Sequence, residues 1–173
     1  LIDDWRGHWG QRRLDFLIIQ LPGYQRRRTV SIHSQWALLR EAQYLAGCSR
    51  DAEVIVSYDT GDENDLHPRD KHPVALRAAE RAAALISGRE VPRSPVFSLV
   101  TFSGNVLRIR FETWGGRLVF HGEPSGFAIC GADGVFYPAE ARIISDNELE
   151  VFHPGLPEPT AVYYAWSNFP TGN

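Results

Sequence analysis

The segment AEVIVSYDTGDENDLHPRDK, residues 52–71, decides which fold we expect for this chain. It opens with residues 52–59, a short run rich in Val and Ile that is typical of a strand. The run gives way to a polar loop at residues 60–69, after which Asp70 is placed to cap an alanine-rich helix that Gly88 ends. The segment therefore predicts a strand, a polar loop and a helix in succession.

The residues before this segment predict a second strand and a second helix. Residues 14–21, LDFLIIQL, are nearly all apolar rather than alternating, as in a strand that is covered on both faces. Ser34 can cap a following helix, and Gly47 is placed to end it. Strand, helix, strand and helix in this order imply a right-handed crossover in a doubly wound α/β layer. The apolar side of the first helix carries Trp36, Leu39, Ala42, Leu45 and Ala46.

The pattern changes after residues 89–95, REVPRSP, whose two prolines and charges predict a linker. Beyond it apolar and polar residues alternate, and residues 103–105 provide a turn between strand-like runs at 97–102 and 106–111. Further turn signals separate short alternating strands as far as residues 161–166. We therefore expect a small antiparallel β-sandwich, similar to a jelly roll, in the C-terminal half.

The composition indicates a packed globular protein and excludes several partners. Of the 173 residues, 43% are hydrophobic and 12% are aromatic, which excludes disorder of the whole chain. The net charge of −3 gives no broad basic surface for phosphate backbones, so we expect no nucleic-acid partner. The one basic cluster, residues 26–28, is expected in a solvated loop.

The chain also lacks the features of a membrane or secretory segment. No apolar run approaches the roughly 20 residues that span a bilayer, and residues 1–13 lack the hydrophobic stretch of a signal peptide. Cys48 and Cys130 lie far apart and fit no metal-ligand spacing. Because methionine is absent and the first residues already resemble the interior of a fold, we expect a fragment or a processed subunit.

Chemistry is expected in the polar loop, because ligands of open α/β sheets bind beyond the carboxyl ends of the strands. Residues 61–68, GDENDLHP, hold His67 among three carboxylates. An imidazole beside a carboxylate can take a proton from a serine hydroxyl, since the acid fixes the ring tautomer and stabilises the imidazolium. The alternative is that Asp62, Glu63 and Asp65 are solvated loop acids and His67 is a surface residue.

Metal sites and sugar-stacking sites compete with this interpretation. The six histidines include no His-Glu-x-x-His helix, and His67 and His72 have no third ligand nearby in the sequence, so we expect neither a metal nor a cofactor. Tryptophans can stack on sugar rings, although buried aromatic side chains are more common. Trp36 and Trp166 lie on apolar stripes and are expected in the core, whereas Trp114, beside the glycines of a turn, is the candidate for exposure.

Residues 64–71, NDLHPRDK, followed by an alanine-rich helix, resemble the Asp-(Ile/Leu)-His-Pro-(Lys/Arg)-(Asn/Asp)-Lys segment of the sialate O-acetylesterases, a branch of the SGNH/GDSL hydrolases. The resemblance covers almost the whole chain, and it implies the C-terminal part of an SGNH-type parallel-sheet hydrolase domain followed by a β-module. The other stretches that are similar to this family, in the same order, are residues 5–10, 16–21, 36–43, 131–141 and 164–170.

At the matching positions the resemblance implies catalytic roles for two residues. His67 is implied as the base that deprotonates a nucleophilic serine and later activates water to hydrolyse the acetyl-enzyme. The wider superfamily commonly has an aspartate three residues before this histidine, where this chain has Asn64. Asp65 is the available substitute, and a backbone carbonyl or a carboxylate from elsewhere is the rival for orienting the ring.

The nucleophile of that family is missing from this chain. Its serine lies in a block of the Gly-Gln-Ser-Asn type near the N-terminus of the catalytic domain, and neither this block nor the oxyanion-hole glycine and asparagine are found here. No Gly-x-Ser-x-Gly elbow exists, and Ser34, Ser49, Ser103 and Ser125 lack a matching context. We therefore expect the chain alone to be inactive and a companion N-terminal polypeptide to carry the serine.

The expected molecule is an α/β chain with residues 1–90 as the C-terminal part of an SGNH-type hydrolase domain and residues 91–173 as the β-sandwich module. It is expected to supply the histidine of a serine-type esterase that removes O-acetyl groups from sialic acid or another glycan, and the resemblance implies a secreted, periplasmic or lysosomal location. The rival is a non-catalytic carbohydrate-binding or interface subunit. Because two strands and two helices leave apolar faces uncovered, we expect residues 1–90 to pack against a companion segment.

Overall fold

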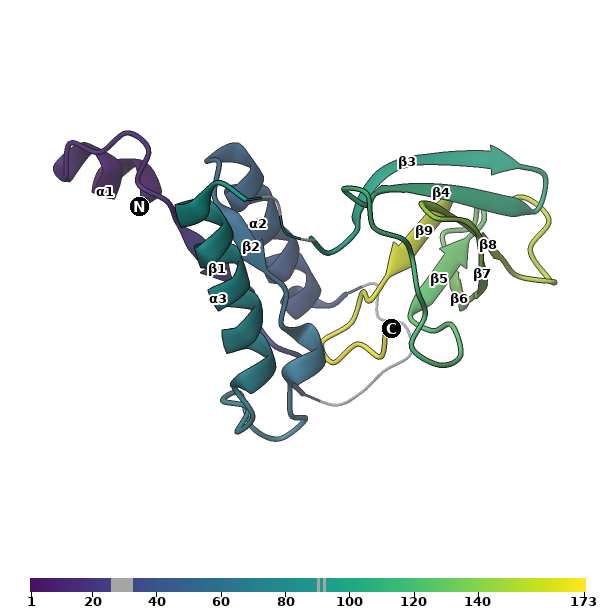
Figure 1. Cartoon of the computed structure of the whole chain (residues 1–173). Coiled ribbons are helices and arrows are strands. Elements are labelled where there is room, and N and C mark those ends of the chain that lie inside the picture. Colours follow the sequence, from purple (N-terminus) through teal and green to yellow (C-terminus); the bar gives the residue numbers. More distant parts are fainter. Residues whose placement is uncertain (26–32, 90, 92) are drawn as a thin grey trace. The chain divides into compact units, whose positions relative to one another are not determined.

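The computed structural model describes residues 1–25, 33–89, 91 and 93–173, which form two compact units (Figure 1). The first unit contains the described residues within 1–26 and 35–91, and the second contains those within 27–34 and 92–173. The basic cluster at 26–28 and residues 90 and 92 of the expected linker lie outside the described residues. No helix in the described part of the chain is long and apolar enough to cross a membrane.

The first unit contains a short parallel sheet and three helices. Strands β1 and β2 pair in parallel, with Leu17 opposite Glu53 and Ile19 opposite Ile55. Helix α2 connects the two strands, so the expected order of strand, helix, strand and helix is present. The elements in chain order are α1 (Ile2–His8), β1 (Leu17–Ile19), α2 (Gln35–Ser49), β2 (Glu53–Ile55), a 3-10 turn (Tyr58–Thr60) and α3 (His72–Ser87).

The two strands are shorter than the sequence predicts. Each has three residues, within the strand-like runs expected at 14–21 and 52–59. Helix α1 lies in a segment for which the sequence pattern indicates no helix. The chain is therefore an α/β protein, while its assignment to the SGNH type remains a prediction, because two short parallel strands are too few to define a doubly wound sheet.

Helices α2 and α3 cover opposite faces of this sheet. Gly47 of α2 lies against the strands, because a Cβ atom there would be 2.4 Å from Val54 Cγ2 and 3.8 Å from Ile18 Cδ1. Successive strand residues point to opposite faces, so the side chain of Glu53 points away from α2. On that side Arg81 Nη2 of α3 donates a hydrogen bond to Glu53 Oε1 at 2.5 Å. The pair of strands is therefore enclosed between the two helices.

The ends of these helices show where the local sequence is sufficient to predict a helix boundary and where it is not. The prediction that Gly47 ends α2 is wrong, because the helix continues to Ser49 and holds the glycine inside for its close approach to β2. Gly88 ends α3 with a φ of 66°, which confirms its predicted role. Asp70 precedes α3, and its Oδ1 accepts a hydrogen bond from the His72 N–H, the first amide of the helix, at 2.9 Å.

The apolar side of α2 does not face the sheet. Leu38, Leu39 and Leu45 are 52%, 49% and 57% exposed, although they belong to the hydrophobic positions of the helix. Arg40 and Gly47, by contrast, are buried on the inner side. A helix normally buries its apolar stripe against the core of its own domain. Helix α2 therefore presents to solvent the surface that a packed helix would cover.

Gln43, on the inner side of α2, bonds the backbone of β1 at the edge that does not pair with β2. The Gln20 N–H donates to Ile55 O at 2.9 Å, so the backbone groups of the residues on either side of it point to the opposite edge. At that edge Gln43 Oε1 accepts a hydrogen bond from the Leu21 N–H at 2.9 Å, and Gln43 Nε2 donates to Ile19 O at 3.4 Å. The polar side of α2 thus satisfies the backbone at the carboxyl end of β1.

The second unit is built from two antiparallel sheets. The predicted hairpin is confirmed, since β3 and β4 pair from Val96 opposite Glu112 to Ser103 opposite Val106. One sheet has the order β3 (Val96–Ser103), β4 (Val106–Glu112), β8 (Glu148–Phe152) and β7 (Glu140–Ser145). The other has the order β6 (Phe136–Pro138), β5 (Phe127–Cys130) and β9 (Ala161–Tyr164).

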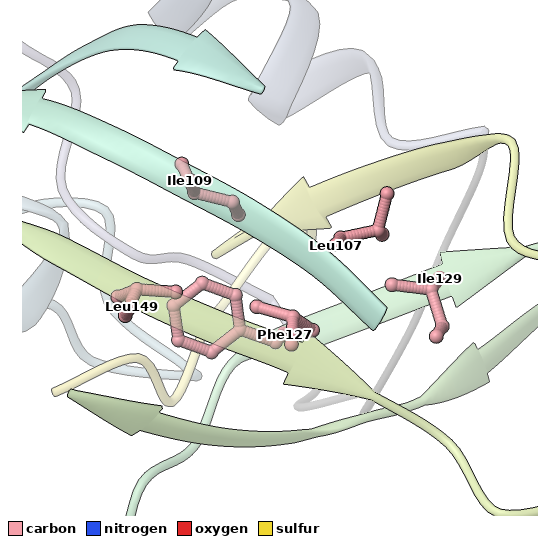
Figure 2. Packing of buried hydrophobic residues seen from close by; sticks show 6 residues of the cluster. Leu107, Ile109, Phe127, Ile129 and Leu149 are labelled. Carbon is pink, nitrogen blue, oxygen red and sulfur yellow. The ribbon is translucent and has the colours of Figure 1, made fainter. Parts of the chain in front are cut away.

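The core of the second unit is shared by strands of both sheets. Inward-facing residues of β4 lie opposite those of β8, and residues of β5 pack against them (Figure 2). Side chains of this kind stabilise a domain by about 1.5–3 kcal/mol each when fully buried. Antiparallel sheets with a common core form the small β-module that the alternating pattern predicts. The buried cluster consists of Leu107, Ile109, Phe127, Ile129, Leu149 and Val151.

Candidate active site

Two loops leave the carboxyl ends of β1 and β2 and run side by side. The Gly23 N–H donates to Tyr58 O at 3.1 Å, and Tyr24 and Asp62 form a parallel bridge. Gly61 lies directly against Gly23, because a Cβ atom at Gly61 would be 1.9 Å from Gly23 O. Only glycine permits this approach. The polar loop that follows Gly61 is therefore fixed at the carboxyl edge of the parallel pair, where α/β proteins bind their ligands.

The turn that leads into this loop is held by buried and charged groups. Ser57 is buried, and its Oγ donates a hydrogen bond to Gln20 O in the neighbouring strand connection. Arg77 of α3 donates to Val56 O at 2.9 Å and to the two carboxylate oxygens of Asp59 at 2.7 and 2.5 Å. The hydrogen bond from Arg77 holds the pKa of Asp59 below its ordinary value. Helix α3 therefore fixes the backbone between β2 and the polar loop.

The loop around His67 is shaped by aspartates that bind backbone amides two residues later. Asp62 Oδ1 accepts a hydrogen bond from the Asn64 N–H, and Asp65 Oδ1 accepts one from the His67 N–H, each at 2.8 Å. Such turns are a common use of aspartate in loops. Pro68, the next residue, is buried. The backbone of His67 is thus held on one side by the Asp65 carboxylate and on the other by a buried proline.

The structure brings Asp65 and His67 together through the backbone of this turn. His67 is exposed, and within the described part of the chain its ring makes no hydrogen bond or ion pair. The imidazole is therefore accessible to a side chain of another segment. The role of Asp65 as the acid that orients the ring remains a prediction, because the recorded bond joins its Oδ1 to the amide of His67.

Arg40 places a positive charge on the inner side of α2. It is 5% exposed, and burial lowers its pKa to about 10, an effect that nearby Tyr58 partly opposes. The Arg40 carbonyl accepts a hydrogen bond from Gln20 Nε2 at 3.0 Å. With a pKa of about 10 the guanidinium is still protonated at neutral pH. A cation is therefore held beside the residues that connect β1 and β2 to their loops.

Three of the serines without a motif context are held by hydrogen bonds. Ser34 Oγ donates to Asn168 Oδ1 at 2.6 Å, and Ser125 Oγ donates to Thr171 O at 2.6 Å. Ser49 Oγ donates to Ala46 O at 3.1 Å within the last turn of α2. These bonds are typical of structural serines. They give no reason to assign a nucleophile to any of the three.

Sequence reasoning finds the His67 loop but misses the groups that support it. Ser57, Asp59 and Arg77 come together only through tertiary contacts between β2 and α3. The one signal in the sequence is the pair of glycines, Gly23 and Gly61, each of which follows a strand-like run. A glycine after each of two parallel strands is consistent with two loops that approach closely. That signal predicts proximity without predicting which side chains hold the turn.

Two other expectations of site residues can be compared with the structure. Trp114 is 41% exposed, as predicted, whereas Trp36 and Trp166 are partly buried. Trp36 Nε1 donates to Pro22 O at 2.7 Å. Among the residues that the structure describes, no group of three or more His, Cys, Asp or Glu side chains is arranged to hold a metal ion.

Comparison with known proteins shows a similarity to a solved structure. No protein-family model matches the chain, and no curated protein matches it. Among solved structures, the crystal structure of a carbohydrate acetylesterase from Xanthomonas citri matches with a TM-score of 0.87 and 32% sequence identity. The match covers 96% of this chain and 39% of that chain. The chain therefore spans about two fifths of the length of this relative.

Proposed function

We propose that this chain is part of a carbohydrate esterase and supplies its catalytic histidine, His67. The enzyme would hydrolyse O-acetyl esters of sialic acid or another glycan by a serine/histidine acyl-enzyme mechanism. The observation that carries the proposal is the fixed position of the His67 loop at the carboxyl edge of β1 and β2. The similarity to a carbohydrate acetylesterase over 96% of the chain supports the class of reaction. Residues 1–90 then form the C-terminal part of an SGNH-type domain, and residues 91–173 form its β-module.

In the proposed reaction His67 acts as a general base and then as a general acid. Its imidazole takes the proton of a serine hydroxyl while the serine oxygen attacks the acetyl carbonyl carbon. The bond between that carbon and the sugar oxygen breaks, and the imidazolium gives its proton to the sugar oxygen. Water that His67 deprotonates then attacks the acetyl-serine, acetate leaves, and the serine regains its proton. The exposed ring of His67 suits a serine that approaches from another segment.

The orientation of the His67 ring requires a partner for its second nitrogen. We assign this task to Asp65, whose Oδ1 already bonds the His67 N–H at 2.8 Å and which lies half-buried in the same turn. A carboxylate that bonds the ring in this way would also stabilise the imidazolium that forms during the reaction. A backbone carbonyl or a carboxylate from another segment is the rival orienter.

The remaining parts of the reaction centre are assigned to a companion polypeptide. It carries the nucleophilic serine and the oxyanion donors, because this sequence contains no motif that supplies them. Without those groups the chain by itself is inactive. The substrate is an acetylated carbohydrate, and the location is secreted, periplasmic or lysosomal. No metal or cofactor is required for this chemistry.

A chimera tests the proposal. In the Xanthomonas citri enzyme the aligned 39% is replaced by this chain, and hydrolysis of an aryl acetate is measured. His67→Ala should lower turnover by roughly 10³-fold or more, since the base and the nucleophile act as one unit. His72→Ala is the matched control, because His72 is an exposed histidine five positions later, at the start of α3. Near-normal turnover of His67→Ala, or a folded chimera without esterase activity, would contradict the proposal.

A second candidate function is a non-catalytic carbohydrate-binding or interface subunit. The exposed Trp114 of the β-unit is the observation that favours it, because tryptophan faces bind sugar rings. In that case the His67 loop has lost its catalytic role. The two functions differ in the chimera experiment: loss of turnover in His67→Ala supports the esterase, and equal turnover of both histidine variants supports the binding subunit.

A further inference from the structure

Trp114 occupies a backbone position that tryptophan rarely takes. The Gly116 N–H donates to Thr113 O at 2.8 Å and closes a four-residue turn, in which Trp114 and Gly115 have φ values of 46° and 79°. Two central residues with positive φ are the mark of a type I′ turn, whose first central position favours Asn, Asp or Gly. A bulky side chain with positive φ is strained. The folding of this turn therefore gives no reason for a tryptophan.

The indole is nevertheless held in a defined position. The guanidinium carbon of Arg93 lies 5.4 Å from the centroid of the indole ring, and the backbone N–H of Trp114 donates to Glu112 Oε1 at 3.1 Å. The side chain remains 41% exposed, so it contributes little to a core. Strained residues that persist in a well-held position are concentrated at functional sites. The combination of strain, support and exposure points to a role for the indole surface itself.

The loop that begins with this turn is long and is held by contacts with the core and with Asn173. Residues 113–126 connect β4 to β5 without regular secondary structure, and ordered loops of about this length are uncommon in compact domains and are often functional. Leu118 and Phe120 pack against the core of the second unit. At the far end, Asn173 Nδ2 donates to His121 O at 3.0 Å and to Glu123 O at 2.8 Å. The loop is thus fixed at both ends, and Trp114 projects from a rigid support.

We propose that Trp114 is a glycan-binding platform, on which a pyranose ring stacks through its C–H face. The choice of a carbohydrate ligand rests on the proposed function. The electron-rich face of an indole attracts the slightly positive hydrogens on one side of a sugar ring, and tryptophan gives the largest such face. Arg93 supports the indole through a cation–π contact. The platform serves to hold the polysaccharide, whereas His67 acts on its ester.

The test uses binding rather than hydrolysis. The whole chain is titrated with hexasaccharides of β-1,4-linked glucose, xylose and N-acetylglucosamine, none of which carries an O-acetyl ester, and binding is followed by calorimetry. Trp114→Asn should weaken binding by about tenfold or more, because it removes the stacking surface. Its melting temperature should be unchanged or higher, because Asn suits the first central position of the turn. Trp114→Phe should retain part of the affinity.

Control variants separate this proposal from the esterase. Trp9→Ala removes a tryptophan that is 56% exposed in the first unit and should leave binding unchanged. The hexasaccharides carry no O-acetyl ester, so a failure of the esterase assignment leaves this measurement readable. Absence of binding to all three hexasaccharides would overturn the platform. Equal binding by Trp114→Asn, or a clear drop in its melting temperature, would also overturn it, because the tryptophan would then be structural.

Discussion

Three aspartates around His67 have the same structural task. Asp62, Asp65 and Asp70 each accept a hydrogen bond from the backbone amide two residues later, at 2.8 to 2.9 Å. The acidic residues of this loop therefore have a structural role, in addition to the catalytic role that we propose for Asp65. Asp65 is the member whose amide partner belongs to His67. Substitutions at Asp65 can therefore separate the effect of the turn on activity from the effect of the negative charge.

We predict that Asp65→Asn in the esterase chimera costs less activity than His67→Ala. Asn keeps an oxygen that can accept from the His67 N–H, so the turn is retained while the negative charge is lost. The remaining carboxylates of the loop, Asp62 and Glu63, partly replace that charge. The loss should be roughly 10²-fold smaller than for His67→Ala, as in other triads where the acid is removed alone. Turnover of an aryl acetate measures both variants.

Asp65→Ala provides the comparison for this prediction. It removes both the charge and the acceptor of the 2.8 Å hydrogen bond, so it should lose more activity than Asp65→Asn and lower the melting temperature. If Asp65→Asn is as active as the unmodified chimera, Asp65 serves only the turn. The orienter of His67 is then a backbone carbonyl or a carboxylate of another segment.

At the scale of elements, one carboxylate connects three strands on the outer face of the larger sheet. Glu150 of β8 lies between β4 and β7, and its Oε1 accepts from Arg108 Nε at 2.9 Å. Its Oε2 accepts from Arg142 Nε at 2.8 Å and from Arg142 Nη2 at 2.6 Å. Glu150 is 5% exposed, although both arginines reach into solvent. Three strands therefore depend on the ionised form of a single buried side chain.

We predict that the contribution of Glu150 to stability decreases in acid. Hydrogen bonds from Arg142 and then Arg108 hold the pKa of Glu150 below its ordinary value of 4.5. A carboxylate with a lowered pKa in the folded state stabilises the fold fully above its unfolded pKa, and this stability is lost as the pH falls through the folded pKa. Glu150→Gln should lower the melting temperature at about pH 7, and the difference should be smaller at about pH 3.

Thermal unfolding followed by circular dichroism checks this pH dependence. Glu148→Gln is the matched control, because Glu148 is also on β8 but bonds a single arginine, Arg110, at 2.8 Å. Its effect should be smaller, since one partly exposed ion pair contributes little. A difference between Glu150→Gln and the unmodified chain that is equal at both pH values would contradict the prediction.

The elements that sequence predicts well are those whose signals are local. Gly88 ends α3 because its left-handed conformation depends only on its own helix, and the β3–β4 hairpin follows from alternation and a turn. Gly47 misleads, because its role is the approach of α2 to Val54, a contact between elements. The exposure of Leu45 also departs from the general tendency of a helix to bury its apolar side. In both cases tertiary packing decides what local propensity leaves open.

The candidate site likewise combines features that the local sequence predicts with features that depend on tertiary contacts. The location of His67 beyond a strand follows from the order of elements in the sequence, and its motif is contiguous along the chain. The groups beneath it are not contiguous: Ser57 meets Gln20, and Asp59 meets Arg77, across 37 and 18 positions of sequence. Such pairs depend on the geometry of the folded sheet, so one sequence without its structure does not indicate them.

At the scale of the whole molecule, the first unit exposes an unusual amount of apolar surface. On α2, Leu38, Leu39 and Leu45 are about half exposed. Ile19 in β1 is 47% exposed, although a strand of a parallel sheet is normally covered on both faces. Exposed apolar groups of this kind mark surfaces that bind another polypeptide. The surface fits the proposal that a companion segment completes the domain.

We therefore predict that the isolated chain associates through α2. Replacing Leu38 and Leu45 together by Gln should raise the monomer fraction in sedimentation velocity, because burying the exposed half of each leucine contributes about 1 kcal/mol. Helix content should be unchanged, since both side chains already point to solvent. Val119→Gln, at a valine that is 54% exposed in the second unit, is the control and should leave association as it was. A monomeric unmodified chain, or association that persists in the double variant, would show that α2 is not the surface that a companion covers.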